Sequence, residues 1–176
     1  MTEEQFWDIV AQTLRFKDDA AKQAKALENV LGALPDDDIV GFDTLFVAQK
    51  HRAFRWDLWG AAFVIHGGAS DDAFDYFRSW LIAQGKDAFE QALADPDSLA
   101  DLIAPGRIMP LENEAFGQIA GKLWHHQTGL RFGRLPSDRL SEDTDGPDGE
   151  PFEEDDETLA RCYPKLWAMF GQTPLG

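Results

Sequence analysis

Residues 58–65 form a segment that is apolar around most of a helical wheel, because it contains only Leu, Trp, Gly, Ala, Phe, Val and Ile. Such a helix is stable only when other elements cover nearly all of its surface. Gly67 follows as a stop signal, and Ser70 can cap a second helix whose apolar residues recur at steps of three and four. The sequence therefore predicts a central helical hairpin over residues 56–84.

The same helical spacing recurs along the rest of the chain, and no alternating strand pattern or hairpin turn is present. Thr2 and Gln5 have the form of a capping box, Asp36–Asp38 can satisfy a helix start, and Pro164 separates two short helices. The expected helices span residues 3–16, 18–34, 36–53, 56–66, 71–84, 86–94, 111–128 and 157–170, with a short turn at 98–103. We predict an all-α, single globular domain over residues 1–176 with about seven to nine helices.

Much of the chain's formal charge of −16 lies in one segment. Residues 142–157 carry ten acidic side chains and no basic one, which leaves 22 acids against 16 bases elsewhere. Gly and Pro at positions 146–151 disfavour a helix, so residues 142–155 are expected to be an acidic surface loop inserted between helices. Three arginines precede the loop: Arg131, Arg134 and Arg139.

Composition also restricts the function class. The negative charge argues against nucleic-acid and anionic-membrane partners, and no apolar run approaches the roughly 20 residues of a membrane span. A single cysteine, Cys162, cannot form an intramolecular disulfide and is expected to be a packing residue of a helix. The N-terminus lacks the basic residues of a secretory signal, so the expected location is cytoplasmic.

The hairpin sequence resembles a known family. The segments are RWDLWGAAFVIHGG at 55–68 and SDDAFDYFRSWLI at 70–82, together with TEEQFW at 2–7, ENE at 112–114 and YPKLW at 163–167. They are similar to the bacterial proteins grouped as domain of unknown function 4240, over most of the chain outside the acidic loop. The resemblance implies no established activity.

Polar residues near the hairpin turn suggest one chemistry. Antiparallel packing would bring His66 close to Asp71 and Asp72, and an imidazole beside carboxylates can act in acid–base catalysis. A divalent metal could instead be held by His66, Asp71 and Asp75, although no cofactor is predicted outright. The alternative is structural, because acidic residues stabilise the first turn of any helix.

A second set of polar and aromatic residues surrounds the same hairpin. As a binding pocket, the arginines and aromatic rings would hold an anion or an aromatic ligand. As structure, the arginines would form ion pairs with aspartates between helices, and the tryptophans would be core residues. The candidate binding residues are Arg55, Trp56, Asp57, Trp59, Tyr76, Arg78 and Trp80.

These patterns favour a non-enzymatic protein-binding module, in which residues 142–157 meet a basic protein partner. Nucleophile-elbow, P-loop, dinucleotide-binding and zinc-protease motifs are all absent from the sequence. His125 and His126 cannot both reach one metal, because neighbouring helical residues point about 100° apart. Two alternatives stay open: a hydrolase-like enzyme using His66, Asp71 and Asp72, and an immunity-type inhibitor of a basic toxin.

Overall fold

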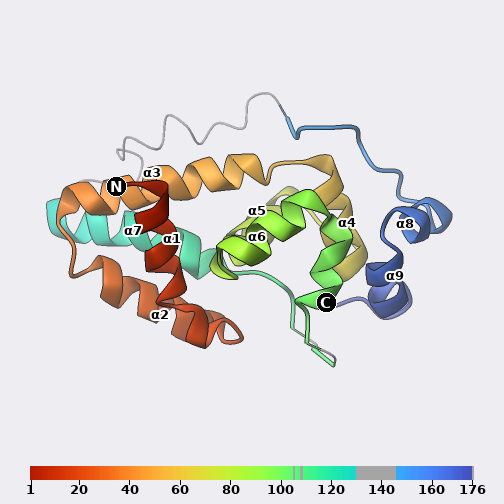
Figure 1. Ribbon diagram of the computed structural model, residues 1–176, viewed down its shortest axis with the longest axis horizontal. Coiled ribbons are helices and arrows are strands. Elements are labelled where there is room, and N and C mark those ends of the chain that lie inside the picture. Colours follow the sequence, from red (N-terminus) through yellow and green to blue (C-terminus); the bar gives the residue numbers. More distant parts are fainter. Residues whose placement is uncertain (105, 108, 130–145, 176) are drawn as a thin grey trace.

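Every regular element in the part of the chain that the structure describes is helical (Figure 1). The computed structural model describes residues 1–104, 106–107, 109–129 and 146–175. The elements are α1 (Glu3–Ala11), η1 (Leu14–Phe16), α2 (Ala20–Leu31), α3 (Asp36–Arg52), α4 (Trp56–His66), α5 (Asp71–Ala83), α6 (Lys86–Ala94), η2 (Pro96–Asp101), α7 (Glu114–Thr128), α8 (Asp156–Cys162) and α9 (Pro164–Phe170), where η marks a 3₁₀ helix. The all-α prediction is confirmed, and none of these helices is long and apolar enough to cross a membrane.

Local capping signals define most helix starts. The Thr2–Gln5 capping box forms, Ser70 accepts from the backbone of Ala73 at the start of α5, and Pro164 occupies the first turn of α9. The helix predicted over 3–16 is shorter, because the chain turns after Ala11 into η1. Helix α7 likewise starts at Glu114 and not at 111, since Asn113 caps it.

The start of α3 also differs from the prediction. Pro35 is its N-cap and makes no side-chain hydrogen bond, so Asp36–Asp38 lie within the first turn and do not cap it. Their carboxylates oppose the positive end of the helix dipole.

One half of the core surrounds α7, which packs against α2, α3 and α5. In Figure 1, α3 and α7 run side by side. A chain of aromatic rings joins these helices, with Phe42 against Phe6 and Phe46 against Phe116 at centroid distances of 4.9 and 6.2 Å. The inward face predicted for 36–53 is confirmed, because Ile39, Phe42, Phe46 and Ala53 are buried.

Helix α4 organises the other half. Its apolar residues are buried on several faces, as the sequence predicts, and Gly67 ends it with a left-handed φ of 69°. Helix α4 touches α5 through the hairpin but contacts α9 more extensively. A Cβ on Gly60 would lie 2.3 Å from the hydroxyl of Tyr163, so only glycine allows this approach.

The acidic segment is only partly a free surface loop. Residues 146–155 contain no helix, as expected, but Asp148 pairs with the backbone on both sides of Arg55. The amide of Trp56 donates to the Asp148 carbonyl, and the Asp148 amide donates to the Phe54 carbonyl, each at 2.9 Å. The ring of Phe152 then packs on α4. Residues 142–145 and the three arginines at 131, 134 and 139 lie outside the described residues.

Candidate functional site

His66 is used inside the fold. Its Nε2 accepts a hydrogen bond of 3.0 Å from the backbone amide of Leu111, and its ring meets Phe77 edge-on. Burial lowers the pKa of His66, with Arg107 acting in the same direction and the Ala62 carbonyl opposing both. The neutral imidazole therefore ties the end of α4 to the segment that leads into α7.

The expected neighbours of His66 have other surroundings. Asp71 and Asp72 are exposed in the first turn of α5, while Asp75 pairs with Lys50 and Arg78. Within the described ranges, no three His, Cys, Asp or Glu side chains are placed to hold a metal. The structure does not bring His66, Asp71 and Asp75 together as a metal site, because His66 turns toward Leu111.

Arg55 and Arg78 are both committed to internal partners. Arg55 binds the carboxylate of Asp57 through Nε and Nη2, and its Nη1 donates to the Leu93 carbonyl at 2.9 Å. Arg78 is 4% exposed and donates to the Lys50 carbonyl and to Asp75. Its guanidinium lies 4.5 Å from the ring centroid of Phe54. These contacts match the structural interpretation, with charged groups joining helices.

The aromatic candidates form a stack. Trp59 stacks between Trp56 and Phe74 at 5.3 and 4.8 Å, and its Nε1 donates to the Ala69 carbonyl. Trp80 is buried against Phe77. Tyr76 differs from these rings because its hydroxyl lies near a charge: the Glu114 carboxylate is the main cause that raises its pKa. The stack fills space between α4 and α5, and none of these rings lines either of the two cavities described below.

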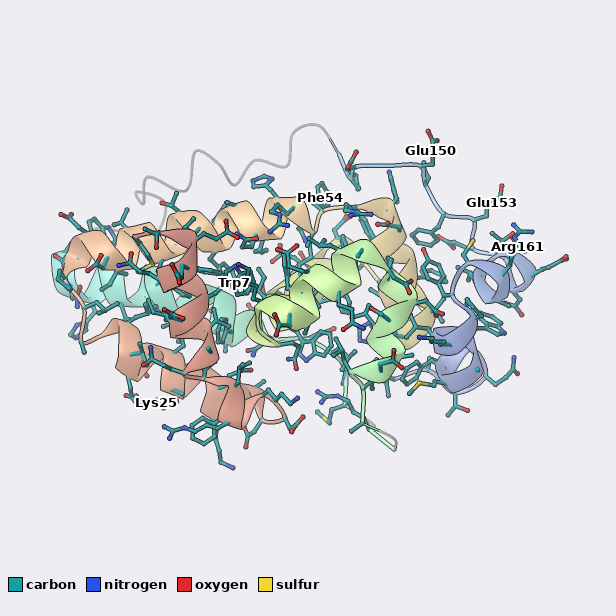
Figure 2. The ribbon with its side chains drawn as sticks, viewed as in Figure 1. Trp7, Lys25, Phe54, Glu150, Glu153 and Arg161 are labelled. Carbon is teal, nitrogen blue, oxygen red and sulfur yellow. The ribbon has the colours of Figure 1, made fainter. Side chains whose placement is uncertain are left out.

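A cavity of about 470 Å³ lies beside the acidic segment and is here called the acid-walled pocket. Its apolar lining includes Pro96, Pro151 and Phe152, and Arg161 is the one basic residue that lines it in the described part of the chain. Its carboxylates are those of Asp57, Asp95, Asp97, Glu150 and Glu153. Figure 2 shows Glu150, Glu153 and Arg161 at one end of the molecule.

The five carboxylates are not equivalent. Asp57 is held by Arg55, and Asp97 accepts from the backbone amides of Lys165 and Leu166 at 3.0 Å each. Within the described part of the chain, Glu150 and Glu153 make no ion pair or side-chain hydrogen bond, and both are exposed. Asp95 is exposed as well, but its carboxylate accepts the amide of Asp97 at 3.1 Å as the N-cap of η2. Glu150 and Glu153 are therefore the two lining carboxylates with no hydrogen bond or ion pair among the described residues.

Cys162, the last residue of α8, and Tyr163, its C-cap, also line this pocket. Tyr163 donates from its hydroxyl to the Asp57 carbonyl at 2.8 Å, and burial strongly raises its pKa, so the phenol stays protonated. Cys162 is exposed, so the expectation that it is a packing residue of a helix is wrong. It occupies the last turn of α8, where its side chain faces the pocket and solvent.

Comparison with known families gives one match. A family model described as "Protein of unknown function (DUF4240)" matches residues 1–126. The chain belongs to this family. No curated protein and no solved structure matches it. The resemblance found in the hairpin sequence is thereby confirmed over 1–126, while YPKLW at 163–167 lies beyond the matched region.

Two cavities differ in how they lie relative to the region that matches the DUF4240 model. The acid-walled pocket takes Glu150–Tyr163 from outside the matched region. A second cavity, lined by residues 12–30, lies wholly within it. None of the candidate residues named from the sequence lines this second cavity. Its signal was present, because residues 15–25 hold four of the 16 basic residues against two acids in a strongly acidic chain.

Proposed function

We propose that this DUF4240 protein is a non-enzymatic protein-binding module whose acid-walled pocket docks a lysine- or arginine-rich segment of a partner protein. The observation that carries the proposal is the pair Glu150 and Glu153, exposed and without ion pairs among the described residues, at the edge of a 470 Å³ cavity.

The chemistry of the pocket suits a long cationic side chain. Lys and Arg bury an aliphatic stem on apolar surface while the charged head stays near solvent. Phe152 and Pro151 supply such a surface directly beside Glu150 and Glu153. The wider segment reinforces the attraction, since residues 146–157 carry seven acids and no base. A neutral or acidic segment of a partner could not neutralise the negative charge of this segment.

The wall that carries the two glutamates is held in place before any partner arrives. The backbone pairing at Asp148 fixes one side, and the ring of Phe152 packs against Phe63 and Trp56 at 5.4 and 6.1 Å on the other. A preformed wall lowers the ordering cost of association. An acidic chain that is wholly solvated would not offer this advantage.

The experiment is fluorescence anisotropy with a labelled decalysine peptide and three forms of the full chain. The double variant Glu150→Gln/Glu153→Gln is expected to bind about tenfold more weakly than the parent, a difference of about 1.4 kcal/mol. The matched control, Glu4→Gln/Asp87→Asn, removes the same charge from exposed positions on α1 and α6 and should bind as the parent does.

Salt gives a second readout, because an association carried by these charges weakens steeply from low to physiological ionic strength. Equal losses in the pocket variant and the control would mean that only net charge matters, and would overturn the assignment to this pocket. Absence of binding by the parent at low salt would overturn the proposal itself.

A further inference from the structure

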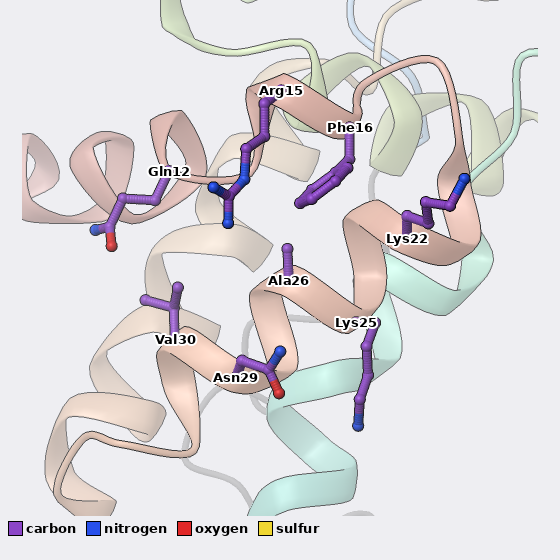
Figure 3. Close-up of a pocket in the computed structure, with 8 residues that line it drawn as sticks. All are labelled: Gln12, Arg15, Phe16, Lys22, Lys25, Ala26, Asn29 and Val30. Carbon is purple, nitrogen blue, oxygen red and sulfur yellow. The ribbon is translucent and has the colours of Figure 1, made fainter.

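The cavity formed by residues 12–30, here called the basic-lined pocket, has a volume of about 400 Å³. Figure 3 shows Arg15 and Phe16 on η1 facing Ala26 on α2, with Lys22 and Lys25 extending outward from the same helix. This volume falls within the roughly 300–1,000 Å³ of small-molecule sites. The pocket therefore has the size of a ligand site and lies away from the acidic segment.

The charge of this pocket is opposite to that of the chain. Arg15, Lys22 and Lys25 line it, and no acidic residue does. Within the described residues, the only contact recorded for the Arg15 guanidinium is with the ring of Phe16, 4.8 Å from its centroid. An anion is thus the natural partner of Arg15.

Among the described residues, the two lysines pair only with nearby side chains. Lys22 pairs with Asp19 and Lys25 with Glu28, each three residues away on the helix and largely exposed to solvent. Exposed pairs of this kind hold their side chains weakly. Both ammonium groups can therefore turn toward an anion that enters the pocket.

The charges and the apolar residues of the lining favour one class of anion over others. Arginine binds the oxygens of phosphate or carboxylate with two parallel hydrogen bonds. Three cations favour a doubly charged group such as a phosphate monoester over a single carboxylate. Phe16, Ala26 and Val30 supply an apolar floor that inorganic phosphate cannot use. The favoured ligand is an organic phosphate with a ring or similar apolar body.

Buried hydrogen bonds join the two elements that form the pocket. Gln23 is fully buried and donates to Thr13 Oγ1 at 3.2 Å and to the Ala83 carbonyl at 2.6 Å. These bonds join the turn before η1 to α2 and to the end of α5. Since η1 is held against α2 in this way, the pocket does not have to be assembled by the ligand.

The acidic segment does not cancel this local positive charge. Figure 1 places α2 and α8 at opposite ends of the molecule's long axis, and Figure 2 shows Lys25 far from Glu150 and Glu153. Charges in water are largely screened beyond about 8 Å at physiological ionic strength. We propose that the basic-lined pocket binds an organic phosphate monoester of nucleotide size, with Arg15 as its principal phosphate contact. This site is independent of the peptide docking proposed above.

Isothermal titration calorimetry with AMP, adenosine and inorganic phosphate tests the proposal on the full chain. AMP is expected to bind at least tenfold more tightly than either adenosine or inorganic phosphate. Arg15→Gln should weaken AMP at least tenfold and Lys25→Gln to a smaller degree, with unchanged thermal melts because both side chains are exposed. Arg161→Gln, an exposed arginine at the other pocket, should bind AMP as the parent does.

Each other outcome overturns a stated part. If AMP does not bind in the millimolar range or tighter, the ligand class is wrong. If inorganic phosphate binds as well as AMP, the apolar floor plays no part. If Arg161→Gln loses as much affinity as Arg15→Gln, the site is elsewhere. None of these results bears on decalysine binding, so the two proposals fail separately.

Discussion

The basic-lined pocket and the acid-walled pocket differ in how the chain builds them. The basic-lined pocket comes from one continuous stretch, residues 12–30, in which η1 folds back on α2. The acid-walled pocket gathers residues near positions 57, 95–97 and 150–163 from three distant parts of the chain. A local pocket depends on a few neighbouring contacts, whereas a gathered pocket depends on the whole tertiary structure.

Their buried supports differ in kind as well. Beneath the basic-lined pocket, the neutral amide of Gln23 connects Thr13, Ala83 and Asn113. In the lining of the acid-walled pocket, the carboxylate of Asp97 accepts the free amides at the start of α9. An N-terminal helix amide without a partner is costly when buried, so Asp97 acts as a cap supplied from a distant part of the chain. Substitutions at Gln23 and Asp97 test these two supports separately.

The largest effect is expected at Gln23. Gln23→Leu keeps the volume but leaves the Ala83 carbonyl and the Asn113 amide without this partner, and each buried group so orphaned costs about 1–3 kcal/mol. Urea unfolding should show a loss of about 3 kcal/mol. The control Gln91→Leu, on the exposed face of α6, should change stability by less than about 0.5 kcal/mol. Equal stabilities for the two variants would contradict the role of Gln23.

A smaller loss is expected at Asp97. Asp97→Ala removes the cap of α9 and should lower the free energy of unfolding by about 1–3 kcal/mol. The control is Asp101→Ala on the same 3₁₀ helix, since among the described residues the side chain of Asp101 makes only an exposed ion pair with Lys165. Thermal melts distinguish them. If both variants melt together, the distant cap does not support this end of the molecule.

The smallest effect is confined to acidic pH and concerns His66, which connects the two halves. Because burial lowers its pKa in the folded state, the unfolded chain binds this proton more readily as the pH falls below about 6.5. The contribution of neutral His66 to stability is therefore present above that pH and is lost below it. Urea midpoints at pH 7.5 and 5.5 should fall further for the parent than for His66→Gln. Parallel curves would show that His66 does not titrate as argued.

The sequence predicted the helices well where the signal is short-range. Ser70 caps α5 through an amide three residues away, and the 86–94 helix has the predicted bounds. The prediction from sequence was wrong where a side chain has candidate partners both near and far along the chain. His66 has Asp71 and Asp72 nearby in sequence, yet it binds the amide of Leu111, 45 residues away.

Sequence patterns were enough to predict the all-α class, the buried character of α4, the acidic segment and the family. Each of these depends on periodicity, capping or composition, which act between residues close in the chain. The tertiary structure was needed to show that Arg55, which is partly exposed, and Arg78, which is buried, pair with other groups of the fold. It was also needed to show that Glu150 and Glu153 are exposed beside a cavity. The reason is physical, because desolvation and hydrogen-bond geometry depend on neighbours that the order of residues does not name.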